Sequence, residues 1–339
     1  MTLHNGFCWV CSLRSIIIDI HQFNEMRVKA SGATRAASAV SIAEELSRCS
    51  PNMVLGTQQD PSEFLIILLN MVIECLSSTL SNSFTQYQSS VIHSFIGINM
   101  KSFIRCEICS TSHQNETYES LWSVPVGSHS SVCAALAAFC ADEQLFGVNA
   151  FNCSNCQRRV KACRKMKLAN IAPIMFIHLK RFVYDNRRRM TIKLKHFVKL
   201  QEAIDLTPYV DQDDVQQRNK NYEDHRSIYS LLGVLVHLGD AAETGHVFAY
   251  ILAPDNEWYK ADDEIVTRVS LDVVLNDRNA YVLCYGRTTK TRCIRWTPEQ
   301  SRHGAKPSWF SSTPRRFDDE SDSTDSDCSP VRVAIDHRI

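Results

Sequence analysis

The sequence lacks an excess of charge of either sign, a long hydrophobic run and a basic N-terminal segment. Its 339 residues include 37 Lys and Arg and 37 Asp and Glu, so no net field favours nucleic acid or an anionic membrane. The longest apolar stretch, Phe64 to Leu76, has 13 residues, and a membrane-spanning helix needs roughly 20. Arg14 is the first Lys or Arg, too late for a secretory signal. We therefore expect an intracellular protein, cytoplasmic or nuclear, that binds neither nucleic acid nor a membrane.

Apolar periodicity predicts helices in the first 80 residues. Apolar positions recur every three to four residues from Trp9 to Phe23 and again from Phe64 to Cys75. Asp60 is a good N-cap for the second helix, Pro61 suits the first helical position, and Glu63 falls at the capping-box position. Two predicted helices therefore occupy this part of the chain.

Strand-forming segments take over from about residue 91. They are rich in β-branched and aromatic residues. The segments we expect as strands are 175–178, 182–184, 229–238, 246–252 and 280–285. Helices first and strands afterwards indicate an α+β fold with a mostly antiparallel sheet.

The composition changes near residue 288. From there the chain is rich in basic and small polar residues, and a run of acidic residues and serines follows from Asp318 to Asp327. Such a segment has too little apolar surface to offset its ordering entropy. We expect one folded domain at 1–287, with its helical part at about 1–90 and the rest at about 91–287, and a disordered acidic serine-rich tail at 288–339.

Fourteen cysteines are the unusual feature of the composition, and four of them form two C-x2-C pairs. Cys106 with Cys109 and Cys153 with Cys156 are separated by 43 residues, so an inserted hairpin must bring them together. Four thiolates from two such pairs can surround one tetrahedral zinc ion. The sequence predicts one structural zinc with no open coordination site. The alternative is four reduced structural cysteines; a redox dithiol fits less well, because neither pair opens a helix in a βαβ unit.

A second candidate site combines a thiol, an imidazole and a carboxylate. Cys8 directly precedes the first predicted helix, whose dipole favours the thiolate. His246 follows Gly245 at the head of a strand, and Asp262 comes sixteen residues later. A cysteine hydrolase needs a nucleophile, a base and an orienting acid. The alternative for Cys8 is a small buried apolar residue, and order alone is weak evidence in a chain with 12 histidines.

At these residues the sequence resembles the ubiquitin-specific protease family of cysteine deubiquitinases, from residue 5 to about 286. Residues 58–65 match the family's Gln-Gln-Asp-x-x-Glu-Phe-Leu motif closely, and residues 173–182 end in its Lys-Arg-Phe. The other matching segments are a diverged cysteine box at 6–13, a histidine box at 229–250, the segment 258–263 and a closing strand at 281–285.

The resemblance implies a papain-like hand. A helical thumb would carry Cys8, an antiparallel β palm would carry His246, and zinc-ribbon fingers would hold the four cysteines. The family's roles then fall on Cys8 as nucleophile, His246 as base and Asp262 as the orienting acid, with Asp263 as a possible supporting group.

The resemblance also implies where the ubiquitin tail binds. Gln59, Asp60 and Gly245 fall at tail-binding positions, although Asp60 is equally well explained as a helix N-cap. The segment 239–245 would be a flexible loop over the tail. Among other candidate bases, His178 lies in an apolar strand and is expected in the core, and His237 does not match the family's Gly-His position.

The cysteine box departs from the family pattern. Leu3 stands where the family has an asparagine that donates to the oxyanion, and Cys11 and Ser15 replace an asparagine and a glutamine. Loss of one oxyanion donor costs roughly 10² to 10³ in rate. We expect a thiol-dependent ubiquitinyl hydrolase acting on ubiquitinated proteins. The alternatives are a weakened or inactive ubiquitin-binding module on the same fold, and a zinc-stabilised protein without affinity for ubiquitin.

Overall fold

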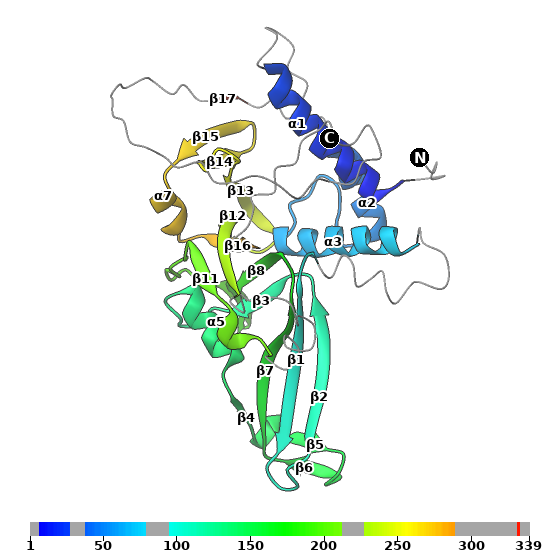
Figure 1. Ribbon diagram of the computed structural model, residues 1–339, viewed down its shortest axis with the longest axis vertical. Coiled ribbons are helices and arrows are strands. Elements are labelled where there is room, and N and C mark those ends of the chain that lie inside the picture. The colour runs from blue at the N-terminus through cyan, green and yellow to red at the C-terminus, as the bar shows by residue number, and fades with distance from the viewer. Residues whose placement is uncertain (1–6, 28–37, 79–94, 212–226, 289–330, 333–339) are drawn as a thin grey trace, which may run out of the picture.

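The polypeptide has three connected parts, and a computed structural model describes residues 7–27, 38–78, 95–211, 227–288 and 331–332. Figure 1 shows N-terminal helices beside a β-sheet, with a long narrow sheet extending away from both. We call these parts the thumb (7–78), the palm (the nine-stranded sheet and its short helices) and the fingers (the four-stranded sheet and one small hairpin). This α+β hand is the predicted fold class.

Three helices make the thumb. They are α1 (Trp9–Arg27), α2 (Val40–Cys49) and α3 (Pro61–Ser78). α3 begins where the sequence predicts, because an Asp60 carboxylate oxygen accepts the backbone N–H of Ser62 at 2.7 Å. Among the described residues, Glu63 does not return the second bond of the capping box. α2 was not predicted, and its buried Ile42 and Leu46 pack with Trp9 against the later turns of α3.

The palm sheet carries four of the five segments predicted as strands, and the fifth, 182–184, forms β9 (Phe182–Asp185), which pairs with β10 (Met190–Lys193) in a separate two-stranded sheet. In sheet order its strands are β17 (Val331–Arg332), β15 (Ile265–Val269), β14 (Trp258–Asp262), β13 (Thr244–Leu252), β12 (Ile228–Ala241), β16 (Ala280–Arg287), β8 (Ile174–Lys180) and β3 (Trp122–Pro125), with β11 (Ala203–Asp205) also paired to β12. Neighbours run antiparallel except β3 and β8, which are parallel. The mostly antiparallel sheet is therefore confirmed.

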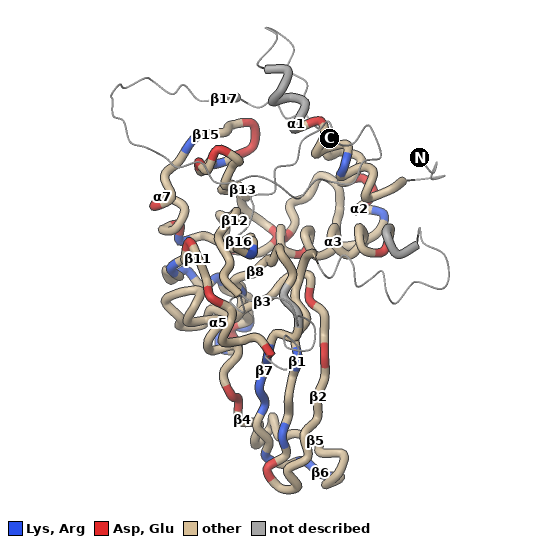
Figure 2. Tube along the Cα trace, viewed as in Figure 1, with Lys and Arg blue, Asp and Glu red and all other residues tan. Residues whose placement is uncertain are grey.

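The fingers are a second antiparallel sheet. Its order is β2 (Ser112–Glu119), β1 (Ile98–Cys106), β7 (Ala162–Ile171) and β4 (Glu143–Leu145), and β5 (Phe151–Cys153) pairs with β6 (Arg158–Val160) at the tip. Basic residues on β7 face acidic residues on and before β4, as Figure 2 shows by colour, and Arg164 pairs with Glu143 and Lys165 with Asp142. These exposed pairs contribute little each to stability.

The palm core is built around a buried arginine as well as apolar side chains. Arg181 is fully buried, and its guanidinium donates to the carbonyl oxygens of Ala280, Leu194 and His196 at 2.8, 3.1 and 3.0 Å. Burial lowers the pKa of this guanidinium. The shorter elements around the sheet are α5 (Val132–Cys140), α7 (Leu271–Leu275), β9 (Phe182–Asp185) and β10 (Met190–Lys193). Arg181, the arginine of the Lys-Arg-Phe motif, thus fixes the direction in which the chain leaves the palm sheet between β8 and β9.

Most of the predicted tail lies outside the described residues. The last long strand, β16, ends at Arg287, and the tail is described only at Thr288 and at Val331–Arg332, which pair with Ile265 and Val266 at the sheet edge. Among the described helices, none is both long enough and apolar enough to cross a membrane.

Candidate active site and metal centre

The palm brings His246 and Asp262 together. β13 and β14 are antiparallel neighbours, so His246 near the start of one lies beside Asp262 at the end of the other. Nε2 of His246 is 2.5 Å from Oδ1 of Asp262. The carboxylate accepts, so this ring nitrogen carries the hydrogen and Nδ1 is left as the basic atom. The two side chains are 44% and 27% exposed, open enough for a substrate to approach.

A lysine keeps the Asp262 carboxylate ionised. Lys260 Nζ lies 2.6 Å from Oδ2, and this contact, followed by the His246 bond, lowers the pKa of Asp262. Asp263 occupies the two-residue turn between β14 and β15 with φ of 50°, exposed but with an oxygen within 4.8 Å of the His246 and Asp262 ligand atoms. Of the two neighbouring acids, Asp262 is the one that orients the imidazole.

The segment 239–245 is a tight hairpin, which corrects the expectation of a flexible loop. β12 continues to Ala241 and β13 starts at Thr244. Gly245 has φ of 139°, and a Cβ there would lie 2.0 Å from the Leu238 carbonyl oxygen, so only glycine fits. Its N–H donates to Oε1 of Gln58 at 2.8 Å, which ties the palm hairpin to the segment before α3.

The predicted tail-binding residues of the thumb are engaged within the protein. Gln59 donates to Thr57 at 2.7 Å. Asp60 accepts the N–H and the hydroxyl of Ser62 on one oxygen and the Tyr281 hydroxyl, at 2.8 Å, on the other. The N-cap interpretation of Asp60 is thus confirmed. Gln58 and Tyr281 are the residues that sequence reasoning missed: each was seen only as part of a motif, and nothing local signals a contact between thumb and palm.

Cys8 lies at the start of α1, where its carbonyl accepts the N–H of Ser12. Its Sγ is 3.6 Å from Sγ of Cys75 on α3 and accepts the N–H of Cys11 at 3.4 Å. Burial raises the pKa of Cys8, but hydrogen bonds from Cys11, Cys75 and Val10 outweigh it and hold the pKa below its usual value.

Cys8 is not beside His246 in this arrangement. The start of α3 touches the palm hairpin, whereas Cys75 lies about 20 Å further along the helix, at 1.5 Å per residue from Pro61. Figure 1 agrees, since α1 begins near the N label on the right of the view, whereas β13 lies on the left, beyond the other end of α3. The structure therefore joins two of the predicted catalytic residues and places the third at the far end of the thumb.

His178 and His237, the other two candidate bases, pack inside the palm. His178 Nδ1 lies 3.1 Å from the Ser123 hydroxyl, and its ring stands edge-on to Tyr281. Burial lowers the pKa of His178 to about 4. His237 is 1% exposed, and burial, followed by Lys193, lowers its pKa too. Both imidazoles are neutral near pH 7.

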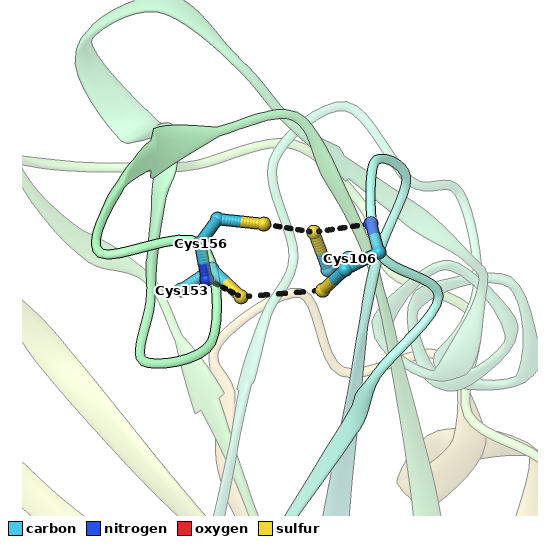
Figure 3. A group of neighbouring side chains, drawn as sticks. Cys106, Cys153 and Cys156 are labelled. Atoms are coloured by element: carbon cyan, nitrogen blue, oxygen red, sulfur yellow. Dashed lines mark hydrogen bonds between the residues drawn. The ribbon is translucent and has the colours of Figure 1, made fainter.

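The four cysteines of the fingers converge. Cys106 and Cys156 have sulfurs 3.8 Å apart and Cys109 and Cys153 have sulfurs 3.6 Å apart (Figure 3). All four sulfurs lie within 4.8 Å of one another. A tetrahedral zinc with Zn–S bonds of about 2.3 Å separates its sulfurs by about 3.8 Å. The donor set therefore fits a closed tetrahedral metal site.

The backbone around each pair supports metal ligation. N–H groups of Ile108 and Cys109 point at the Cys106 sulfur, and that of Cys156 points at Cys153. Ser110 and Gln157, which follow the second cysteine of each pair, have φ of 59° and 52°. Two matching turns thus present their sulfurs inward, as the inserted-hairpin prediction requires.

Comparison with known proteins places most of the chain in one family. The sequence profile described as Ubiquitin carboxyl-terminal hydrolase matches residues 10–285. Ubiquitin carboxyl-terminal hydrolase 23 of Arabidopsis thaliana is 28% identical over 286 residues, 83% of this chain and 30% of that protein. Ubiquitin carboxyl-terminal hydrolase 17-like protein D of Mus musculus is 34% identical over 235 residues, 68% of this chain and 40% of that protein.

A solved structure shares the fold. The chain is similar to one in the SAGA Ubp8/Sgf11/Sus1/Sgf73 DUB module bound to ubiquitin aldehyde, with a TM-score of 0.66, 20% identity, and coverage of 83% of this chain and 60% of that one. The chain thus spans 30% and 40% of the length of the two relatives named above.

Proposed function

Because this chain belongs to the ubiquitin carboxyl-terminal hydrolase family, we propose that it is a cysteine-dependent deubiquitinase that hydrolyses the isopeptide or peptide bond after the C-terminal glycine of ubiquitin. Ubiquitin and ubiquitinated proteins are its proposed partners, since the relatives named above are ubiquitin carboxyl-terminal hydrolases. An intracellular site, cytoplasmic or nuclear, goes with this proposal, because thiol metal sites persist in reducing compartments.

The observation that carries the proposal is the bond between His246 and Asp262 on neighbouring palm strands. In the proposed reaction the Cys8 thiolate attacks the carbonyl carbon of the terminal glycine. The His246 imidazolium then gives its proton to the leaving amine, and the imidazole later takes a proton from the water that hydrolyses the thioester. Asp262 holds the ring, and Asp263 is a supporting polar group.

The reaction requires the start of α1 to reach the palm. Cys8 Sγ must come within hydrogen-bond reach of His246 Nδ1, whereas it now lies against Cys75. We therefore place catalysis in an arrangement of the thumb that ubiquitin binding favours. Gln59, Asp60 and Gly245 are proposed to contact the ubiquitin tail. The hydrogen bond from Tyr281 keeps Asp60 in position, and the bond that Gly245 donates to Gln58 keeps Gly245 in position.

One zinc ion is proposed in the fingers, held by Cys106, Cys109, Cys153 and Cys156. A site closed by four thiolates leaves no position for substrate, so its contribution is structural. The ion would fix the fingertip hairpin β5–β6 to the end of β1.

Capture by a ubiquitin C-terminal propargylamide tests the function. We expect wild-type protein to form a covalent adduct, Cys8→Ala to form none, and Cys11→Ala, a neighbouring exposed thiol, to form it as wild type does. The second candidate is a ubiquitin-binding module without catalysis, in which Cys8 would stay apart from the palm. Saturable binding of ubiquitin without any adduct would support that candidate and refute the hydrolase.

A further inference from the structure

Two thiols that are remote in sequence meet inside the thumb. Cys8 begins α1 and Cys75 lies in α3, and their sulfurs are 3.6 Å apart. Both side chains are partly buried, and the surrounding packing of Trp9, Met71 and Val72 holds the two helices in contact. Closing this gap to a disulfide bond needs a movement of about 1.5 Å, because bonded sulfurs lie about 2.05 Å apart.

The two sulfurs differ in chemical character. Cys8 sits at a helix N-terminus and accepts the Cys11 N–H, which favours its thiolate. Burial raises the pKa of Cys75, so its proton remains in place and can be shared with Cys8. A thiolate beside a protonated thiol is the arrangement in which one cysteine reacts with peroxide and its neighbour resolves the product.

We propose that Cys8 and Cys75 are a peroxide-responsive modification site that forms a reversible disulfide across α1 and α3. The consequence for activity rests on the proposed function, because Cys8 is the proposed nucleophile, but the disulfide itself does not. Cys11 is the competing partner, because Cys8 and Cys11 have the C-x2-C spacing of a dithiol at a helix N-terminus, and the experiment below separates the two pairings.

The chemistry needs a hydroperoxide as oxidant. The Cys8 thiolate attacks one peroxide oxygen, the O–O bond breaks, and Cys8 becomes a sulfenic acid while the departing hydroxide takes up a proton to give water. The Cys75 sulfur then attacks the Cys8 sulfur, the S–O bond breaks, and the second hydroxide leaves as water with the proton that Cys75 loses. Two thiols and one hydrogen peroxide thus give one disulfide and two waters.

The disulfide would inhibit a hydrolase in two ways. It would consume the nucleophile, and it would hold the start of α1 at Cys75, about 20 Å along α3 from the palm hairpin. It would also protect Cys8 from the irreversible sulfinic acid. A dithiol reductant would restore the Cys8 thiolate and would release the start of α1 from Cys75.

Peptide mapping of the full chain tests the site directly. After treatment with equimolar hydrogen peroxide and alkylation of the remaining thiols, trypsin with Glu-C releases Cys8 in residues 1–14 and Cys75 in residues 75–101, away from Cys49. We expect a joined product whose mass is lower than the sum of the two peptide masses by two hydrogens. Dithiothreitol should separate this product into its two peptides. The variant Cys11→Ser should leave the joined product in place, which assigns the bond to Cys8.

Cys75→Ser is the decisive variant, and Cys49→Ser, an exposed thiol of the same thumb, is its matched control. We expect the joined peptide to vanish in the first, with Cys8 advancing to sulfinic acid, and to persist in the second. Sulfinic acid at Cys8 in wild-type protein without any joined peptide, or a bond from Cys8 to Cys11, would overturn the proposal.

The consequence for activity is measured separately with the ubiquitin propargylamide. Adduct formation should fall at least tenfold after peroxide and recover with dithiothreitol in wild-type protein, but fail to recover in Cys75→Ser. Wild-type recovery that does not depend on Cys75 would count against the switch. If untreated protein forms no adduct, the proposed hydrolase fails while the peptide map still decides whether the disulfide forms.

Discussion

His246 owes its orientation to a single carboxylate. Asp262 accepts from Nε2, and Lys260 neutralises the other carboxylate oxygen. Because this arrangement exists without the thiol, the palm half of the proposed active site is preorganised by two adjacent strands. Its electrostatics can be tested independently of where the thumb places Cys8.

Substitution of this pair should lower turnover of a ubiquitin C-terminal fluorogenic amide. We expect His246→Ala to lower kcat about 10²- to 10⁴-fold, the usual contribution of a general acid–base group. Asp262→Ala should cost about 10²-fold, because the ring loses its orienting partner. Asp263→Asn, at a turn position whose positive φ asparagine tolerates, should lower kcat much less, because it keeps a polar side chain beside the pair. Equal losses at 262 and 263 would contradict the assignment of Asp262.

His178 should make stability depend on pH. Burial lowers its pKa from 6.5 to about 4, so the unfolded chain binds the proton more readily. Stability is full above pH 6.5 and is lost as the pH falls from 6.5 towards 4. We expect the free energy of unfolding in urea to fall by about 2 kcal/mol between pH 7.5 and 5 on this account. His178→Phe, which keeps a ring against Tyr281, should reduce that fall; an unchanged pH dependence would argue against a neutral buried imidazole.

The cysteine cluster of the fingers is the part of the structure that was most predictable from the sequence. Each C-x2-C pair is local, and a turn of fixed shape follows from its spacing, so the ligand set was predictable before the fold was known. The Asp60–Pro61 start of α3 was predictable for the same reason. Local chemistry is visible in a sequence because neighbouring residues are always neighbours in space.

Elements held by tertiary contacts were less predictable. α5 (Val132–Cys140) buries one face, but its exposed positions carry small apolar side chains instead of polar ones, so it lacks the amphipathic period that signals a helix. The contacts of Gln58 with Gly245 and of Tyr281 with Asp60 join segments 187 and 221 residues apart. The meeting of Cys8 with Cys75 is of the same kind, and no spacing rule indicates it.

Loss of one finger ligand should release the proposed metal. We expect about one zinc per wild-type chain by mass spectrometry of metals and close to none in Cys153→Ala, because three thiolates do not close the tetrahedron. Metal binding and folding are coupled, so hydrogen exchange in β5 and β6 should accelerate at least tenfold. Cys163→Ala, on β7 of the same sheet but outside the cluster, should keep its zinc. Retention of full zinc by Cys153→Ala would refute the site.

At the scale of the whole molecule, α3 connects the functional parts. Its first turns place Leu65 and Ile66 against Leu121 and Val282 of the palm, while its later turns belong to the thumb core. The proposed nucleophile and the proposed base are therefore carried by different packing units that share one helix. Motion of α1 over α3 can change the distance between Cys8 and His246 without disturbing the palm.

The boundary of the proposed folded domain can be tested by truncation. Apart from β17, the strands of the palm end at Arg287, and beyond Thr288 the described contacts are only those of Val331–Arg332 with the β15 edge. Two residue pairs at a sheet edge fray readily, so a chain ending at 288 should melt within about 2 °C of the full chain, where 1 kcal/mol corresponds to about 2–4 °C. Its zinc content should also be unchanged.

A chain ending at Asn279 is the control for this truncation, because it lacks β16, whose Tyr281, Leu283 and Tyr285 are buried in the palm. It should fail to melt cooperatively, since β12 and β8 lose the strand that lies between them. A fall of more than about 5 °C on removing only 289–339 would mean that the tail stabilises the fold by more than 1 kcal/mol. In that case the edge of β15 is a docking strand for the tail, and the folded domain extends past residue 287.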